Sequence, residues 1–209
     1  MSPAPSPPII RPATAADWPE LGDVLGRAFH DDPVMSFVIR RRPLVPRASL
    51  LLGMMARLHL DTDTVDVAVD PDSGAIVGAA VWAPPDHWRI PISAYVRNLG
   101  TVLRSIGVGG LPRVTVLSQV ERRHPREPHQ YLAILGTDPA HQGRGVGAAL
   151  LRPVLDRCDE EGLPAYLESS KLSNVPYYAR FGFDVTRELT LTGGPTMYLM
   201  WREPRAPLP

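Results

Sequence analysis

Three alternate glycines, Gly143, Gly145 and Gly147, stand at the start of a small and apolar run that contains Val146. Because glycine has no side chain, consecutive backbone amides in such a segment can come close to a bound anion. The positive end of a following helix dipole would favour the same negative charge. The spacing therefore predicts a phosphate-binding loop, and a tight turn that binds nothing is the simpler alternative.

The glycine segment departs from one nucleotide motif and partly matches another. A P-loop requires Lys followed by Ser or Thr after its last glycine, and the residues after Gly145 lack both. Gly143, Gly145 and Ala148 match G-x-G-x-x-A, and Glu168 suits the acidic residue of a dinucleotide fingerprint. Residues 138–142, however, separate the glycines from the preceding strand, and the sequence after Glu168 is too short for a second nucleotide-binding half. We therefore expect no triphosphate hydrolysis and do not favour nicotinamide chemistry.

Hydrophobic periodicity on both sides of the glycines predicts the elements that would position them. A strand, a glycine loop, a helix and a second strand require a right-handed crossover between parallel strands. Pro153 lies inside the predicted helix, where it should remove one hydrogen bond and kink the axis. The elements predicted for this half are strand 131–136, helix 146–161, strand 165–168, helix 175–181 and strands 183–191 and 196–201.

The first half is predicted to begin with a strand and a helix, for which Thr14 offers the N-cap. Four glycines interrupt the segment 86–129, where we expect helices that cover the substrate side. These patterns predict an α/β or α+β fold with a mixed sheet, in a single domain over 9–203 between proline-rich tails at 1–8 and 204–209. The elements predicted here are strand 9–11, a helix ending at Ala28, an apolar stretch 34–39, a basic loop 40–47, helix 48–60, hairpin strands 64–69 and 75–82, and helices 92–106 and 111–120.

Composition argues against several classes of function. The 22 Lys and Arg residues balance the 22 Asp and Glu residues, so the whole chain shows no basic character suited to nucleic acid or an anionic membrane. The longest apolar runs fall short of the roughly 20 residues that span a bilayer, and we expect no secretion signal. Cys158 is the one cysteine, and the six histidines lack ligand spacing, so we expect no disulfide and no metal site. A reducing cytoplasm fits this composition.

Two sequence blocks, in order, carry a resemblance to a known family. QGRGVG at 142–147 matches the pattern Q/R-x-x-G-x-G/A, and Asn174 followed by YARFGF at 178–183 matches N…Y-x-x-x-G-F. Together the blocks resemble the GNAT N-acetyltransferase superfamily. Residues 131–147, 162–170 and the Asn174 block look particularly like its puromycin N-acetyltransferase branch. The resemblance is strong over 130–201, weaker over 9–83 and poor over 84–129.

The resemblance implies a mixed, mostly antiparallel sheet of about six to seven strands flanked by helices, with a splayed parallel strand pair that holds acetyl-CoA. The strand end would pair with the pantetheine arm, and the loop amides would bind the pyrophosphate. Asn174 would hydrogen-bond the pantetheine arm, cap the following helix, or do both. The coenzyme-binding residues implied are Leu135, Gly136, Thr137, Gln142, Gly143, Arg144, Gly145, Val146, Gly147, Ala148 and Asn174.

Acetyl transfer to an amine needs a proton acceptor for the amine and a proton donor for the departing thiolate. The resemblance gives Tyr178 the position of the donor, and a phenol with a pKa of about 10 is protonated at neutral pH; core packing is its alternative role. Glu168, at a strand end beside the expected cleft, could attract a cationic amine and take its proton, or it could be solvated or bonded to nearby backbone. With no nucleophilic serine motif and no reactive cysteine context, we expect direct transfer in a ternary complex.

The acceptor would be recognised by residues outside the two blocks. Adjacent Asp31 and Asp32 could favour an amine cation, and Trp82 and Trp88 could supply aromatic walls near Phe29. A solvated acidic turn and half-buried core tryptophans are the plainer alternatives. The acceptor's identity, puromycin included, stays open.

The sequence thus predicts an acetyl-CoA-dependent N-acetyltransferase that acts on a primary amine of a small molecule. We expect no nucleic-acid or membrane partner and a cytoplasmic location, and a homodimer is compatible with the resemblance. Two alternatives remain open: a catalytically inactive acetyl-CoA-binding sensor or interaction protein and, less favoured, an NAD(P)-dependent oxidoreductase.

Overall fold

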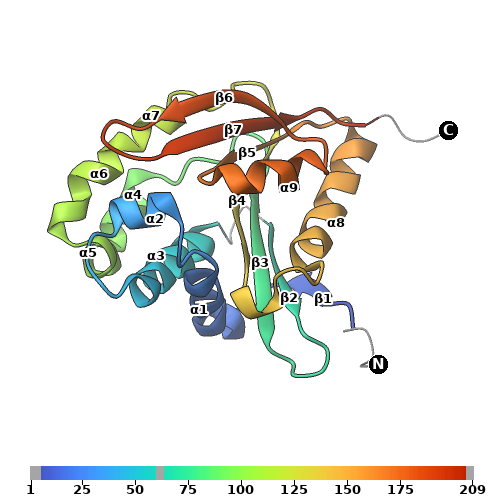
Figure 1. The fold of residues 1–209 in the computed structure, drawn as a ribbon, viewed down its shortest axis with the longest axis horizontal. Coiled ribbons are helices and arrows are strands. Elements are labelled where there is room, and N and C mark those ends of the chain that lie inside the picture. Colours follow the sequence, from blue (N-terminus) through green and yellow to red (C-terminus); the bar gives the residue numbers. More distant parts are fainter. Residues whose placement is uncertain (1–5, 60–63, 206–209) are drawn as a thin grey trace.

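The computed structural model describes residues 6–59 and 64–205 (Figure 1). The predicted helix end at Leu60 and the outer parts of both predicted tails, 1–5 and 206–209, lie outside the described residues. Within the described part, no helix has both the length and the apolar character needed to cross a membrane.

One mixed sheet organises the described residues, with seven strands in the order β1-β2-β3-β4-β5-β7-β6. Neighbouring strands are antiparallel except for the parallel pair β4 and β5. The predicted mixed, mostly antiparallel sheet is therefore confirmed. The strands are β1 Ile9–Pro12, β2 Thr64–Val69, β3 Ile76–Ala83, β4 Gln130–Thr137, β5 Ala165–Ser169, β6 Asp184–Thr190 and β7 Thr196–Arg202.

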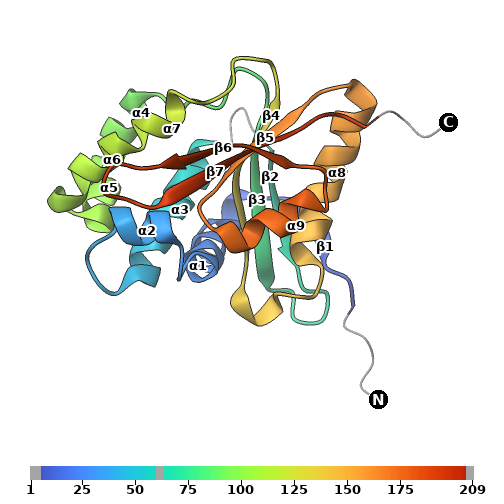
Figure 2. The ribbon, with the colours of Figure 1, turned by 45° about the horizontal axis from the view of Figure 1, so that its top comes forward.

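Helices lie on both faces of this sheet, and Figures 1 and 2 show α4 to α7 gathered at one end of the molecule, away from α8. Single turns of 3-10 helix precede three α-helices and the glycine loop. They are Ala15–Asp17 before α1, Val108–Gly110 before α6, Pro139–His141 before the glycine loop and Leu172–Asn174 before α9. The α-helices are α1 Trp18–Ala28, α2 Pro33–Val38, α3 Leu44–Leu58, α4 Ile92–Arg97, α5 Leu99–Ile106, α6 Leu111–Val116, α7 Ser118–Glu121, α8 Val146–Glu161 and α9 Val175–Ala179.

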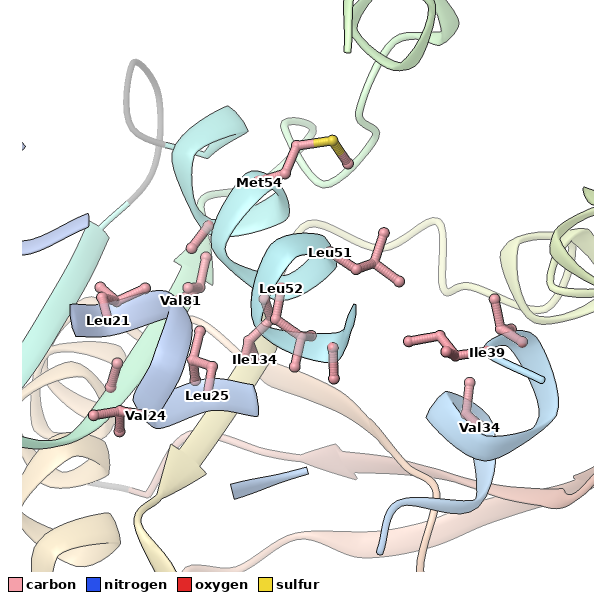
Figure 3. Close-up of a cluster of buried hydrophobic side chains, with 14 of the residues drawn as sticks. Leu21, Val24, Leu25, Val34, Ile39, Leu51, Leu52, Met54, Val81 and Ile134 are labelled. Carbon is pink, nitrogen blue, oxygen red and sulfur yellow. The ribbon is translucent and has the colours of Figure 1, made fainter. Parts of the chain in front are cut away.

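Strand β3 separates two hydrophobic clusters, and every one of its residues is buried. Because strand side chains alternate between faces, Val81 packs with Leu25 of α1 and Leu52 of α3 in one cluster (Figure 3). On the other face Ala80 belongs to the cluster that contains Leu150 of α8. A strand covered by helices on both sides carries a continuous apolar run, as β3 does.

Close packing of α1 on α3 positions the end of α1 beside β4. A Cβ atom on Gly26 would lie 2.9 Å from the Cα of Ser49, too close for any other residue without movement of the helix backbone. Similarly, a Cβ on Gly136 of β4 would lie 2.8 Å from Leu25 Cδ2 and 3.0 Å from Ala28 Cβ. The absence of these side chains lets α1 lie directly against the strand that precedes the glycine loop.

Strands β4 and β5 separate soon after they pair. Their register covers only Gln130 with Ala165, Tyr131 with Tyr166 and Leu132 with Leu167, as far as the described residues show. Strand β4 continues beside β3 as far as Thr137, whereas β5 pairs with β7 on its other side. The splayed parallel pair expected from the resemblance is therefore present.

Several predicted elements have different boundaries. The stretch 34–39 is mostly helix α2, because Asp32 caps it by accepting a hydrogen bond from the Met35 amide at 2.7 Å. Helix α3 begins at Leu44 rather than Ala48, and its Pro46 falls in the first turn, where no amide donor is needed.

The helices of the middle segment are shorter than predicted. The expected helix 92–106 divides at Asn98, whose side-chain amide donates to the Ala94 carbonyl at 2.8 Å. The expected helix 111–120 divides at Leu117 into α6 and α7. Helix α8, by contrast, matches its predicted bounds and runs on through Pro153.

Candidate functional site

A cleft of about 760 Å³ lies where β4 and β5 separate. Its wall combines the end of α1, the unpaired edge of β4, the start of α8, the segment after β5, and α9, segments that Figure 2 shows around one part of the sheet. Most of the residues predicted from sequence meet there. Those that line it are Phe29, Asp32, Leu135, Gly136, Thr137, Gln142, Gly143, Gly145, Val146, Gly147, Ala148, Glu168, Asn174 and Tyr178.

The glycine loop adopts a backbone that favours glycine. Gly143 has φ of 76° and Gly145 has φ of 81°, both in the left-handed region. Nothing lies within 4 Å of a Cβ placed on either residue, so conformation rather than crowding requires glycine there. Gly147 differs, because a Cβ on it would lie 2.5 Å from the hydroxyl oxygen of Tyr177.

The start of α8 faces the cleft without a side-chain cap. Its N-cap is Gly145, and the bond from the Ala149 amide to the Gly145 carbonyl, at 2.9 Å, begins the helical pattern. The amides of Val146, Gly147 and Ala148 precede that bond and have no acceptor within a regular helix. Together with the helix dipole they form a site suited to an anion.

The side chain of Arg144 does not take part in this cradle. Arg144 is exposed and does not line the cleft, unlike its neighbours Gly143 and Gly145. Its predicted role in coenzyme binding is therefore limited to its backbone.

Asn174 ends the 3-10 turn before α9 and lines the cleft. Its side chain makes no capping hydrogen bond to α9. The capping alternative is therefore not realised, and the amide group is available to a ligand.

Two adjacent tyrosines of α9 line the cleft in different ways. Tyr178 is 9% exposed and packs edge-on against Tyr177 and Phe183. Burial raises the pKa of Tyr178 well above its usual value, so its phenol stays protonated. The hydroxyl of Tyr177 is buried without a hydrogen-bond partner, and burial raises its pKa to about 12. Sequence reasoning did not single out Tyr177, and its place in the cleft wall beside Gly147 marks it as a site residue.

Glu168 is held by two groups from other parts of the chain. The Tyr131 hydroxyl donates to Oε2 at 2.6 Å, and Nδ1 of His124 lies 3.3 Å from Oε1. The carboxylate side chain is 11% exposed and reaches the cleft. Its position at the cleft agrees with the predicted proton-accepting role, but it is anchored rather than solvated. Sequence reasoning named neither Tyr131 nor His124, because no local spacing links them to Glu168.

The two aspartates at the end of the α1–α2 turn have different roles. Asp32 lines the cleft, is 3% exposed, and accepts a hydrogen bond from the Ser170 hydroxyl. Burial raises the pKa of Asp32. Asp31 is exposed, does not line the cleft and forms an ion pair with Lys171, which lowers the pKa of Asp31. The expectation that Asp31 binds an amine cation in the cleft is therefore wrong for this structure, because its charge is matched by Lys171.

The two predicted aromatic walls lie elsewhere. Trp82 is fully buried in the cluster beneath α8, so its predicted contact with an acceptor is wrong. Trp88 is not part of the cleft wall either, and its ring stacks on His124 with centroids 3.6 Å apart. It therefore covers a residue that contacts Glu168.

Basic side chains that sequence reasoning missed line the cleft beside α8 and α9. Arg202 donates to Asp159 at 2.6 Å, and Arg180 lies over the Tyr177 ring at 5.1 Å. Arg152 and Arg205 line the same region. In the described residues no group of three or more His, Cys, Asp or Glu side chains could hold a metal ion.

The sequence of this chain matches the model of the acetyltransferase (GNAT) family over residues 40–183. The chain belongs to the GNAT family. It is also 41% identical over 190 residues to an uncharacterized N-acetyltransferase of Schizosaccharomyces pombe, an alignment covering 85% of this chain and 75% of that protein. The predicted family is confirmed, and these matches do not specify a puromycin N-acetyltransferase branch.

Solved GNAT-like structures share the fold. A protein of Corynebacterium glutamicum described as histone acetyltransferase HPA2 and related acetyltransferase superposes with a TM-score of 0.73 at 28% identity, covering 97% of this chain and 99% of that one. Arylalkylamine N-acetyltransferase 2 of Aedes aegypti gives a TM-score of 0.64 at 14% identity, covering 95% and 99%. A GNAT acetyltransferase of Brucella melitensis in complex with acetyl-CoA gives 0.51 at 18% identity, covering 97% and 91%. The last two show likeness of fold alone.

Proposed function

We propose that this GNAT protein transfers the acetyl group of acetyl-CoA to a primary amine of a small molecule, directly and within a ternary complex. The observation that carries the proposal is a single cleft that joins the uncapped amides of α8 to Glu168 and Tyr178. An anion site and a pair of proton-handling groups in one cleft are what transfer from a pyrophosphate-bearing thioester to an amine requires.

The residues of the cleft fit acetyl-CoA. The amides of Gly147 and Ala148 suit the pyrophosphate, and the unpartnered Tyr177 hydroxyl lies beside them. Asn174 and the unpaired edge of β4 offer hydrogen bonds to the amides of a pantetheine arm. The basic side chains beside α8 and α9 would favour further phosphate charge. When bound, acetyl-CoA supplies the activated thioester, and the chain supplies position and proton transfer.

Glu168 accepts a proton in the proposed reaction, and Tyr178 donates one. An ammonium group with a pKa of about 10.4 is charged at neutral pH and must lose a proton before its nitrogen can attack. Glu168 attracts this cation and accepts the proton. Tyr178 keeps its phenol proton because of its burial, and it donates that proton to the departing sulfur. As the amide forms, its nitrogen loses a second proton, which restores the phenol.

Direct transfer is favoured because the one cysteine is unsuited to an acyl-enzyme. Cys158 is 2% exposed, lies within the hydrophobic cluster beneath α8 and does not line the cleft. Burial raises the pKa of its thiol to about 11, which suppresses the nucleophilic thiolate at neutral pH.

The test combines ligand binding with turnover. We expect acetyl-CoA and CoA, but not NADH or NADPH, to raise the melting temperature of the protein. We also expect free thiol to be released from acetyl-CoA when a panel of small primary amines is added. Stabilisation by a nicotinamide cofactor alone would contradict acetyl-CoA binding, and tight acetyl-CoA binding with no thiol release across the panel would support the sensor alternative.

A further inference from the structure

A buried histidine pair lies behind Glu168, on the side away from the glycine loop. His124 follows α7 and His129 precedes β4. Their Nε2 atoms lie 3.0 Å apart, and Nδ1 of His129 lies 2.6 Å from the Glu127 carbonyl oxygen. With the contact between His124 Nδ1 and Glu168 Oε1 at 3.3 Å, these atoms form a continuous chain that ends at the cleft.

The chain of contacts fixes where protons can lie. The Glu127 carbonyl only accepts, so Nδ1 of His129 carries a proton. The contact between the two Nε2 atoms then needs one proton, and the contact between His124 and Glu168 needs another. With all three protons present, the pair is cationic and balances the Glu168 carboxylate. With one proton removed, both imidazoles are neutral. A lone pair of His124 Nδ1 then faces the Glu168 carboxylate, and this contact lacks a proton.

Surrounding rings keep water away from this pair. His124 and His129 are 8% and 4% exposed. Trp88 stacks on His124, and Tyr166 meets both imidazole rings edge-on. These rings limit the contact of both imidazoles with solvent.

Few charged groups face the pair from the elements around it. Glu168 of β5 and the Glu127 loop lie on either side, and Arg89 lies over the Trp88 ring at 4.7 Å. The neighbouring titratable rings are Tyr131 of β4, Tyr166 of β5 and, beyond Tyr131, Tyr95 of α4. Burial raises the pKa of each of these phenols and lowers the pKa of His129. The tyrosines therefore stay neutral.

We propose that His124 and His129 form a buried proton reservoir that acts through Glu168 and stores the proton lost by the acceptor amine. The proposal rests on the proposed acetyl transfer. An ammonium acceptor loses two protons during the reaction: one reaches the departing sulfur through Tyr178, and one remains. Glu168 takes that remaining proton as the N–H bond breaks and passes it to Nδ1 of His124. The pair then holds one positive charge until the product leaves and the proton is released to water.

The first experiment follows the imidazole signals of the full-length protein by NMR over a pH series. We expect the signals of His124 and His129 to titrate together with coupled midpoints. In Glu168→Gln the shared midpoint moves to lower pH by about one or more, because the carboxylate no longer stabilises the imidazolium. Independent titrations that Glu168→Gln leaves unmoved overturn the proposal. This readout needs no acceptor and no turnover.

The second experiment compares pH profiles of kcat/KM for the wild type and His124→Gln with an amine that supports thiol release. In the wild type, activity rises with pH as the pair loses its stored proton. In His124→Gln this acid limb moves to lower pH, toward the range of a lone carboxyl group near about 4 to 5. We also expect kcat to fall by about 10-fold to 100-fold, with the Kd for acetyl-CoA kept.

His87→Gln is the matched control, because His87 is exposed and its Nδ1 lies 2.8 Å from the carbonyl oxygen of the nearby Pro85. We expect its profile and rate to equal those of the wild type. An unchanged profile in His124→Gln contradicts the reservoir. Coupled titration in a protein that acetylates no amine would instead contradict the proposed function while supporting the buried proton pair.

Discussion

Two side chains of the cleft, Tyr178 and Glu168, have opposite surroundings. Tyr178 is packed among aromatic rings, and burial alone holds its proton. Glu168 receives a hydrogen bond from Tyr131 and contacts His124, so its oxygens are kept in fixed positions. Groups whose environments differ in this way are suited to act as acid and base in one reaction.

Replacing the donor should separate chemistry from binding. In Tyr178→Phe we expect kcat to fall by about 100-fold to 10,000-fold, because the departing sulfur loses its proton donor. The ring still packs against Phe183, so the Kd for acetyl-CoA should stay within about two-fold of the wild type. Steady-state kinetics and calorimetry measure the two quantities.

Tyr198→Phe provides the control, because Tyr198 is a half-buried tyrosine of β7 that does not line the cleft. Its kcat should match the wild type. A Tyr178→Phe protein with normal turnover would remove Tyr178 from the reaction.

Residues of the site were predictable where the signal is local. The glycines, Asn174 and Tyr178 lie in short blocks whose spacing is visible in the sequence. Tyr131, Tyr177, His124 and His129 were not predictable, because tertiary packing brings Tyr177 to the cleft and gathers the other three around Glu168. Asp31, Trp82 and Trp88 lie outside the cleft wall for a related reason. Their residue types suit binding, but the burial of Trp82, the stacking of Trp88 on His124 and the ion pair of Asp31 with Lys171 are set by the tertiary structure.

At the scale of elements, the contact between α8 and α9 shapes the anion site. Gly147 in the first turn of α8 faces Tyr177 of α9, and the same ring lies beneath Arg180. The missing side chain at 147 therefore lets the Tyr177 hydroxyl lie against the first turn of α8.

Adding one methyl group should disturb this contact. In Gly147→Ala the new Cβ would lie 2.5 Å from the Tyr177 hydroxyl oxygen, so the phenol must move. We expect the affinity for acetyl-CoA to fall by about 10-fold or more. Removal of the hydroxyl in Gly147→Ala/Tyr177→Phe should return the affinity to that of Tyr177→Phe. Isothermal titration calorimetry measures each variant.

Gly109→Ala is the control, because nothing lies within 4 Å of a Cβ at that position. Its affinity should be unchanged. Equal affinities of Gly147→Ala and the wild type would show that this contact does not shape the anion site.

Elements were predictable to different degrees along the chain. The second half follows strong periodicity, and α8 has its predicted bounds. The segment 86–129 contains short helices, because α4 ends before Asn98 and α6 ends before Leu117. The apolar pattern continues across both residues and therefore does not reveal these helix ends. Helix α2 begins with the Asp32 cap and Pro33, which are local helix-start signals. Sequence reasoning read only an apolar stretch at 34–39 and did not use them.

Across the whole molecule, two polar contacts tie the first half of the chain to the second. Asp32 of the α1–α2 turn accepts from Ser170, and Asp31 pairs with Lys171, both in the segment after β5. The contacts span the cleft from α1 to the end of β5. They therefore hold the α1–α2 turn against the segment that follows β5.

Loss of the buried contact should lower stability. In Ser170→Ala the carboxylate of Asp32 loses a donor while remaining 3% exposed. We expect the free energy of unfolding to fall by about 1–3 kcal/mol, as for other buried groups deprived of a partner. Urea denaturation at neutral pH measures the change.

Ser173→Ala, at an exposed position in the following turn, should change stability by less than about 0.5 kcal/mol. Equal stability of Ser170→Ala and the wild type would show that Asp32 does not depend on this hydroxyl.

The architecture as a whole was predictable only with the resemblance. Periodicity indicates strands and the crossover rule requires one parallel pair, but strand order depends on long-range pairing. The placement of β7 between β5 and β6 joins residues such as Tyr166 and Trp201 that no local pattern connects.

The separation of β4 from β5 also bears on aggregation. A strand edge with unsatisfied backbone groups is a template on which another polypeptide can add a strand. Here that edge is recessed in the cleft between α1 and the α8–α9 pair rather than placed at the rim of the sheet. A slender ligand arm can enter where a second protein strand with side chains on both faces cannot. The helices around the cleft thus shield this inner strand edge from pairing with another chain.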